Sequence, residues 1–139
     1  MREILFRGKR MDDGEWVEGY LVKAVGGECM ILPVTTEHCG GAEFSEGYHC
    51  GPTTVGQYTG LKDKHGKRIF EGDIMKQKDI THKGEIQIEG EKYLVTSSSG
   101  CWFGICKKTD YKRSIFLSEL CNIGEVIGNI HDNPELLEK

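Results

Sequence analysis

The sequence contains no apolar run that approaches the roughly 20 residues of a membrane-spanning helix, and only 37% of its 139 residues are hydrophobic. The first residues also lack a signal peptide, because the apolar stretch Ile4–Phe6 is short and is enclosed by charges. We therefore expect no membrane segment and a protein that stays in the cytoplasm. In that compartment the six cysteines are expected to be reduced.

Proline and positive charge are also scarce. The chain has 3 prolines and 19 glycines, a composition that suits many short strands joined by tight turns. Its net charge is -4. Because nucleic-acid-binding proteins usually carry a basic excess, this balance disfavours nucleic acid as the main partner.

The most informative stretch runs from Gly51 to Met75. Alternate residues from Thr54 to Thr59 belong to opposite faces of an extended segment, and Gly60 ends that segment. Asp63–Gly66 has the composition of a turn, and Gly72-Asp73 predicts a second, tighter turn before Ile74. This order is typical of an SH3-like β-barrel, in which the Asp73 carboxylate accepts hydrogen bonds from loop N–H groups.

Short strands are expected along the rest of the chain, at residues 4–6, 15–23, 29–34, 74–78, 85–88, 92–96, 101–106 and 124–130. Residues 97–100 are expected to form a loop, 114–121 one or two helical turns, and Asn133 to cap a short C-terminal helix. Both faces of Trp16–Val22 carry apolar residues, so we expect that strand to be covered on both sides. The expected class is mainly β, or α+β at most, with little helix.

Residues 35–52 are predicted to form a long loop without strand periodicity. Long loops often carry recognition residues, and the aromatic side chains Phe44 and Tyr48 are candidates for binding. The segment also contains His38-Cys39 and His49-Cys50, residue types that bind zinc. Their spacing matches no zinc finger, so ordinary loop and core roles are favoured, and we expect no metal and no other cofactor.

Other patterns give little support for catalysis. Ser97–Ser99 lies in no nucleophile elbow, Asp12-Asp13 suits a solvated turn, and neither a P-loop nor a Rossmann glycine pattern is present. Cys101 and Cys106 suit a core strand. The aromatic residues Trp16, Trp102 and Phe103 fit a core better than a base-stacking platform. We expect no enzyme.

Several stretches carry a family resemblance, namely residues 2–9, 14–17, 54–64, 69–74, 125–130 and 133–137. Together they resemble the YopX family, small proteins encoded by bacteriophages and prophages. The resemblance implies an N-terminal β-rich subdomain at 1–52, intertwined with an SH3-like barrel at 53–139. Gly60, Gly72, Asp73 and Gly128 are then expected to be structural. The family has no established activity, so no catalytic residues carry over.

These observations favour a non-enzymatic accessory protein of a phage or prophage, a binding or assembly module in the host cytoplasm. The partner is expected to be a protein, and the apolar faces of Trp16–Val22 suggest homo-oligomers. The alternative is a nucleic-acid-binding module, with a cryptic enzyme as a third hypothesis. If the nucleic-acid alternative is right, the basic residues of the barrel part should cluster on one face. These residues are Lys62, Lys64, Lys67, Arg68, Lys107, Lys108, Lys112 and Arg113.

Overall fold

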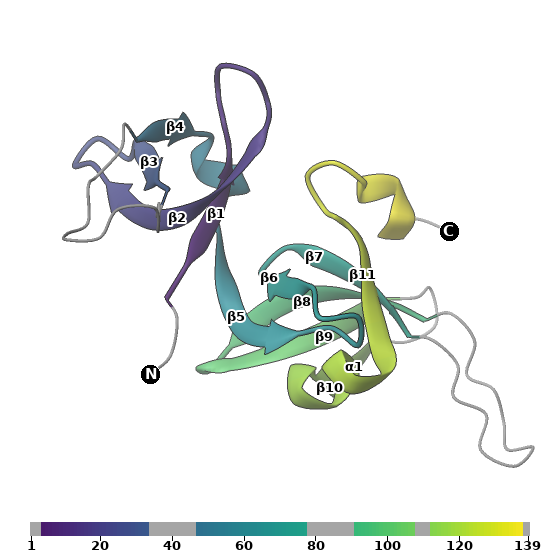
Figure 1. Cartoon of the computed structure of the whole chain (residues 1–139). Coiled ribbons are helices and arrows are strands. Elements are labelled where there is room, and N and C mark those ends of the chain that lie inside the picture. Colours follow the sequence, from purple (N-terminus) through teal and green to yellow (C-terminus); the bar gives the residue numbers. More distant parts are fainter. Residues whose placement is uncertain (1–3, 34–46, 78–90, 108–111, 138–139) are drawn as a thin grey trace, which may run out of the picture. The chain divides into compact units, whose positions relative to one another are not determined.

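The computed structural model describes residues 4–33, 47–77, 91–107 and 112–137 (Figure 1). The prediction of a mainly β chain is confirmed, because these residues form two antiparallel sheets and one short α-helix. The chain divides into two compact units, Met1–Tyr58 and Thr59–Lys139, which are described separately below. None of the helices in the described ranges is long and apolar enough to cross a membrane.

The first unit is an antiparallel meander whose strands pair in chain order. It comprises β1 (Phe6–Lys9), β2 (Trp16–Lys23), β3 (Cys29–Leu32) and β4 (Tyr48–Cys50), followed by a 3-10 turn, η1 (Pro52–Thr54). The beginning of β5 (Gly56–Lys62) pairs with the other edge of β1, through Phe6 and Arg7. Positive φ angles at Gly14 (74°) and Gly27 (90°) allow the turns that precede β2 and β3.

This sheet curls back on its own first strand. The Met11 N–H donates to the His49 carbonyl at 2.9 Å, and the Gly51 N–H donates to the Lys9 carbonyl at 3.0 Å. These bonds join β4 to the chain that follows β1, and the inner side of the curl buries Cys29, Ile31 and Cys50.

The second unit contains the end of β5, a five-stranded sheet, α1 and a 3-10 turn. Its further strands are β6 (Arg68–Phe70), β7 (Asp73–Gln77), β8 (Lys92–Ser98), β9 (Cys101–Lys107), β10 (Lys112–Phe116) and β11 (Gly124–Asn129). The helix α1 (Leu117–Ile123) and the turn η2 (Pro134–Leu137) precede and follow β11. The sheet order is β10-β9-β8-β7-β11, with a bulge in β11 between Val126 and Gly128.

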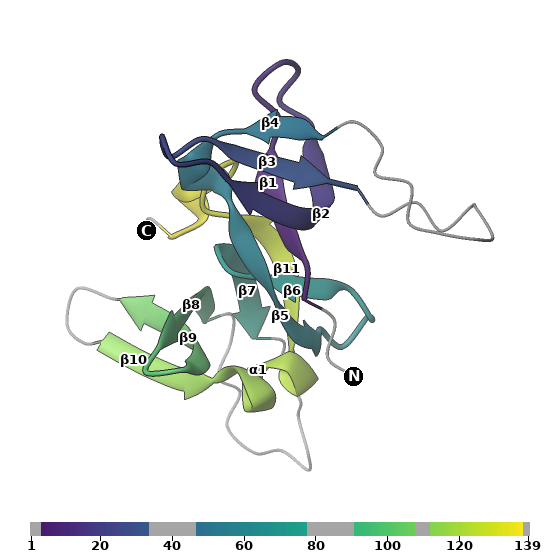
Figure 2. The same cartoon turned by 90° about the vertical axis from the view of Figure 1, so that its left-hand side faces the viewer.

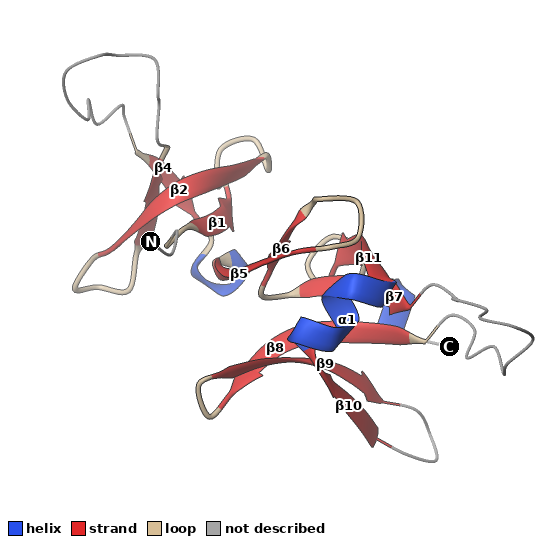
Figure 3. Ribbon diagram, turned by 60° about the horizontal axis from the view of Figure 1, so that its bottom comes forward, coloured by secondary structure: helices blue, strands red, loops and turns tan. Residues whose placement is uncertain are grey.

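The core of the second unit lies between α1 and the sheet, where the helix contacts β9, β10 and β11 (Figure 3). A Cβ atom at Gly104 would lie 2.6 Å from Leu120 and 2.9 Å from Tyr93, so glycine permits the close approach of helix and strand. The buried residues of this core are Ile69, Met75, Tyr93, Val95, Cys106, Leu117, Leu120 and Cys121. Cys101–Cys106 lies in a strand, as predicted, but only Cys106 belongs to the core, because Cys101 at the start of the strand is exposed.

Two buried carboxylates fix the turns around β6. Asp63 is 6% exposed and accepts hydrogen bonds from the N–H groups of His65 (2.9 Å), Lys67 (3.0 Å) and Val126 (3.0 Å). Asp73 is 1% exposed and accepts from the Phe70 N–H at 2.8 Å, the kind of bond predicted for it.

Three sequence-based expectations are wrong in detail. Tyr48–Cys50 is a strand within the predicted loop 35–52. The sequence does not reveal it, because three residues are too few to show a periodicity and their pairing depends on β3 and Arg10. Ser97 and Ser98 belong to β8, because Ser99 (φ 51°) and Gly100 (φ 79°) form a two-residue hairpin turn. The outer face of β2 is open, since Tyr20 and Val22 are each 48% exposed.

The described residues form no closed barrel, in contrast to the SH3-like barrel expected for 53–139. The edge strands β10 and β11 are connected by α1 instead of pairing with each other. The expected strand 85–88 lies outside the described residues. The subdomain bounds 1–52 and 53–139 stay a prediction, because compactness alone does not test independent folding.

Replacing Asp73 with alanine is expected to lower the free energy of unfolding by about 1–2 kcal/mol, because the buried Phe70 N–H loses its acceptor. The Asp73→Asn variant keeps an acceptor oxygen and should lose less. Urea denaturation of both variants measures this difference. An unchanged midpoint for Asp73→Ala would show that the carboxylate does not anchor the turn.

Stability should depend on pH through Asp63. Burial alone would raise the pKa of Asp63, but the N–H groups of Val126, Lys67 and His65 outweigh burial and lower it below the usual 3.8. Because the folded-state pKa is lowered, the stabilisation is complete above the unfolded-state pKa of Asp63 and is lost as the pH falls from there through the folded-state pKa.

We therefore expect Asp63→Ala to cost about 2 kcal/mol at neutral pH and progressively less below about pH 4. Urea denaturation of wild type and variant at neutral and acidic pH measures the gap. The exposed substitution Glu15→Gln is the matched control. A gap that stays constant down to pH 2 would contradict the role assigned to Asp63.

Candidate functional site

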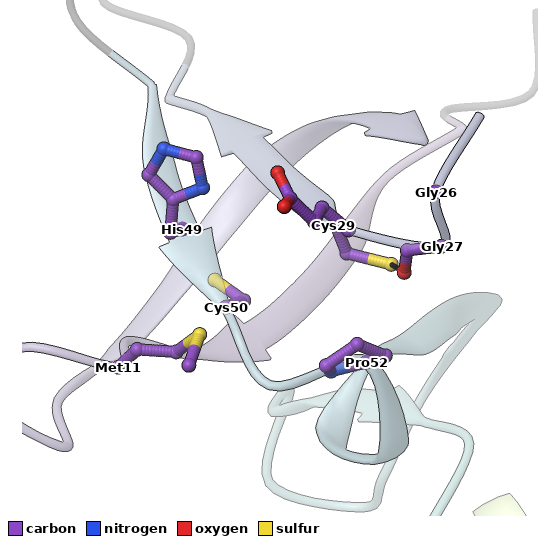
Figure 4. A pocket seen from close by; sticks show the side chains of 8 residues that line it. Met11, Gly26, Gly27, Cys29, His49, Cys50 and Pro52 are labelled. Carbon is purple, nitrogen blue, oxygen red and sulfur yellow. Dashed lines mark hydrogen bonds between the residues drawn. The ribbon is translucent and has the colours of Figure 1, made fainter. Parts of the chain in front are cut away.

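A hollow of about 430 Å³ opens at one end of the first unit's sheet (Figure 4). Its walls come from the turn after β1, the β2–β3 turn, the paired residues of β3 and β4, and the start of η1. The lining residues are Met11, Gly26, Gly27, Glu28, Cys29, His49, Cys50 and Pro52. The register places Cys29 directly opposite Cys50, so the β2–β3 turn and the end of β4 meet at the same end of the sheet.

A second hollow, of about 520 Å³, shares Met11 and His49 with the first. Its other lining residues are Arg10, Asp12, Gly47 and Tyr48. We call the two together the paired hollows. The Met11 side chain belongs to both and is 72% exposed, so its thioether is available to a bound molecule.

The charged residues Arg10 and Asp12 of the second hollow hold each other in place. The Arg10 guanidinium lies 3.9 Å from the centre of the Tyr48 ring. It also donates two hydrogen bonds to Asp12, at 3.1 and 2.9 Å, and lies 3.3 Å from a carboxylate oxygen of Asp13. The hydrogen bond between Asp12 and Arg10 raises the pKa of Arg10 and lowers that of Asp12. Both groups are therefore ionised at neutral pH and form a polar rim.

The two cysteines give the first hollow an apolar floor. The Cys50 thiol donates to the Tyr48 carbonyl at 3.5 Å, and the Cys29 thiol donates to the Gly27 carbonyl at 3.8 Å. Burial raises the pKa of Cys50, an effect that the neighbouring Cys29 increases. Cys50 therefore stays a neutral thiol, which packs like a small hydrophobic side chain and is a poor nucleophile.

The zinc candidates are only partly described. His49 and Cys50 follow each other in β4, and the imidazole is exposed on one face while the thiol is buried on the other. His38, Cys39 and the binding candidate Phe44 lie outside the described residues. Within the described ranges, no three His, Cys, Asp or Glu side chains are close enough to hold a metal ion. Tyr48, the other aromatic candidate, lines the second hollow.

The described basic candidates belong to two different hairpins of the second unit. Lys62, Lys64, Lys67 and Arg68 are exposed around the β5–β6 turn. Lys107 pairs with Lys112 where β9 and β10 lead into their connection, with Arg113 next along β10, whereas Lys108 lies outside the described residues. Figure 2 shows the β5–β6 turn and this end of the β9–β10 hairpin on opposite sides of the second unit.

The residues proposed as structural lie at backbone corners or close contacts. Gly60 and Gly72 have φ angles of 85° and 90°, a region that favours glycine. Gly72 directly precedes Asp73. At Gly128 a Cβ atom would lie 2.5 Å from Asn133 Oδ1, so a side chain there would displace the turn that leads into η2.

Most of the residues that line the paired hollows are not predicted as site residues from the sequence. Arg10, Met11, the Gly26–Cys29 segment and Pro52 were not proposed as site residues. Their only local signals are the Asp12–Gly14 turn beside Arg10 and the glycine turn before Cys29. Their convergence depends on β4, a three-residue strand without a recognisable pattern.

Substitutions in β4 should distinguish a metal site from a packing site. We expect His49→Ala to change the free energy of unfolding by less than about 0.5 kcal/mol, because the imidazole is exposed. Cys50→Ser should cost about 1–3 kcal/mol, because it buries a hydroxyl group. Urea denaturation with and without a chelator measures both effects. If His49 and Cys50 shared a zinc ion, both substitutions and the chelator would destabilise the protein.

Comparisons with known proteins agree with the resemblance noted in the sequence. A crystal structure of protein EF1440 from Enterococcus faecalis is similar to this structure, with a TM-score of 0.59 and 22% sequence identity, over 99% of this chain and 100% of that chain. At this identity the similarity shows the fold alone. No match was found among curated proteins. The family model described as YopX protein matches residues 5–138, nearly the whole chain. The protein therefore belongs to the YopX family.

Proposed function

We propose that this protein is a non-enzymatic accessory module of a phage or prophage, acting in the host cytoplasm, which binds a protein partner through the paired hollows. The observation that carries the proposal is the pair of adjoining hollows around the exposed Met11. Thioether side chains adapt to different partner surfaces, and concave sites with apolar walls and a few fixed polar groups suit recognition.

The chemistry of the walls supports binding more than catalysis. The neutral Cys50 thiol and the Met11 thioether supply apolar surface, whereas Arg10 and Asp12 satisfy each other. A fixed charge pair beside an apolar floor can select a partner side chain by shape and polarity. A catalyst would instead need a reactive group with its pKa adjusted towards the working pH.

The distribution of charge supports a protein partner over nucleic acid. The chain carries a net charge of -4, and its described basic candidates are divided between two hairpins of the second unit, β5–β6 and β9–β10. A nucleic-acid-binding surface usually places its cations along one continuous track. The exposed β5–β6 turn carries Lys62, Lys64, Lys67 and Arg68, so a substitution there can test the nucleic-acid alternative.

The second unit serves as the scaffold in this proposal, and we assign it to a half-open SH3-like barrel. Support comes from the order of its elements, in which a hairpin around β5–β6 precedes the four-strand meander β7–β10, and a short helix separates the last two strands, β10 and β11. Self-association is part of the proposal as well. Tyr20 and Val22 on β2 are each 48% exposed and present apolar surface on one face of the sheet.

The proposal can be tested by comparing what the intact chain and its variants capture from cells that carry the phage. We expect wild type to capture one protein in stoichiometric amount. Met11→Glu should reduce capture of that protein by at least about tenfold, which corresponds to about 1.4 kcal/mol of binding free energy. Quantitative mass spectrometry measures the captured protein. Circular dichroism should show that the variant is folded, because Met11 is exposed.

The matched control is Lys64→Glu, an exposed substitution on the β5–β6 turn that should leave capture unchanged. If Lys64→Glu abolished capture, and nuclease treatment of the wild-type sample also removed the captured material, the nucleic-acid alternative would be established instead. Equal capture by wild type and Met11→Glu would show that the paired hollows do not bind the partner.

A further inference from the structure

Cys29 and Cys50 occupy directly opposed positions on the neighbouring strands β3 and β4. Opposed residues of an antiparallel pair lie on the same face of the sheet. Both side chains are buried, at 5% and 1% exposure, and both are free thiols. Among the described cysteines, no other two face each other across adjacent strands, because Cys101 pairs with Ser98 and Cys106 with Arg113.

The hydrogen bonds around β4 define which kind of antiparallel pair Cys29 and Cys50 form. The bonds from Met11 N–H to His49 and from Gly51 N–H to Lys9 lie on either side of the Arg10–Cys50 bridge. In that pattern the backbone groups of Cys50 point away from Arg10, towards β3 and Cys29. Such a hydrogen-bonded pair has a Cα separation of about 5.5 Å, within the range of about 4.4–6.8 Å that a disulfide spans.

From this geometry we propose that Cys29 and Cys50 are a modification site, at which a small disulfide compound such as oxidised glutathione converts the two thiols into a reversible cross-strand disulfide. Both residues line the hollow of about 430 Å³, which gives a small reagent a route to the sulfur atoms. The proposal does not rest on the identity of any protein partner.

The reaction is a pair of thiol–disulfide exchanges. One cysteine loses its proton and attacks a sulfur of the small disulfide, which forms a mixed disulfide and releases one small thiol. The second cysteine then attacks the mixed disulfide, forms the Cys29–Cys50 bond and releases the other small thiol. The protein is oxidised by two electrons and loses two protons, and the small disulfide is reduced to two thiols.

The disulfide would fasten β4 to β3 and thereby fix one wall of the paired hollows. The strand β4 has only three residues, and the covalent ring would span about 20 residues of chain. Closing such a ring reduces the conformational freedom of the unfolded chain, so oxidised protein should melt about 5–10 °C higher than reduced protein. In a reducing cytoplasm the pair stays as two thiols.

The test equilibrates the intact chain in glutathione buffers of increasing oxidising strength. Intact mass, peptide mapping and thermal melting are then recorded. We expect wild type to lose two hydrogen atoms, to yield a cross-linked peptide pair containing Cys29 and Cys50, and to return to its starting mass with excess reduced glutathione. The exposed control Cys101→Ser should behave in the same way. Cys29→Ser and Cys50→Ser should form no internal disulfide.

Peptide mapping of wild type keeps the test decisive even if a serine variant folds poorly, because it identifies the bonded residues directly. The variant Cys39→Ser removes the cysteine that lies between the two in sequence, and the disulfide should still form. A disulfide that contains Cys39, or six free thiols in the most oxidising buffer, would overturn the proposal.

Discussion

The Asp63 carboxylate is the constraint on which the second unit's scaffold depends. It binds two N–H groups within its own turn and a third from Val126, more than sixty residues later. The same junction contains a hydrogen bond from the Lys64 N–H to the Gly124 carbonyl and a contact of 2.9 Å between His65 and Glu125. One side chain therefore fixes the position of the β5–β6 turn and the beginning of β11 together.

The first unit depends on a close approach rather than on a charge. A Cβ atom at Gly8 would lie 2.7 Å from Cys50 Cβ and 3.4 Å from Ile31, so only glycine lets β1 approach the inner side of the sheet. That approach allows Lys9 and Met11 to bond with β4. The curl brings the turn after β1 beside the β2–β3 turn, and both turns line the first hollow. The second hollow lies between the turn after β1 and the chain of β4.

Local chemistry made most of the fold predictable. The alternation around Tyr58, the Asp63–Gly66 turn and the Gly72-Asp73 corner were all visible in the sequence, because each depends on neighbouring residues. The strand β4 was missed because its pairing is made with residues distant in the chain. The paired hollows were missed for the same reason: of the residues lining them, only His49, Cys50 and Tyr48 were candidates beforehand.

Under the proposed function, the two units would have different tasks in binding. In the second unit, buried carboxylates bond to backbone N–H groups and leave little freedom in the turns, which suits a scaffold. In the first unit, β4 borders a hollow whose floor carries the thiols of Cys29 and Cys50. Backbone hydrogen bonds hold this wall on both sides, because β4 pairs with β3 and the His49 carbonyl accepts from the Met11 N–H. Specificity would then come from the rim, where the Arg10–Tyr48 stack and the Asp12 carboxylate keep fixed positions beside the mobile thioether of Met11.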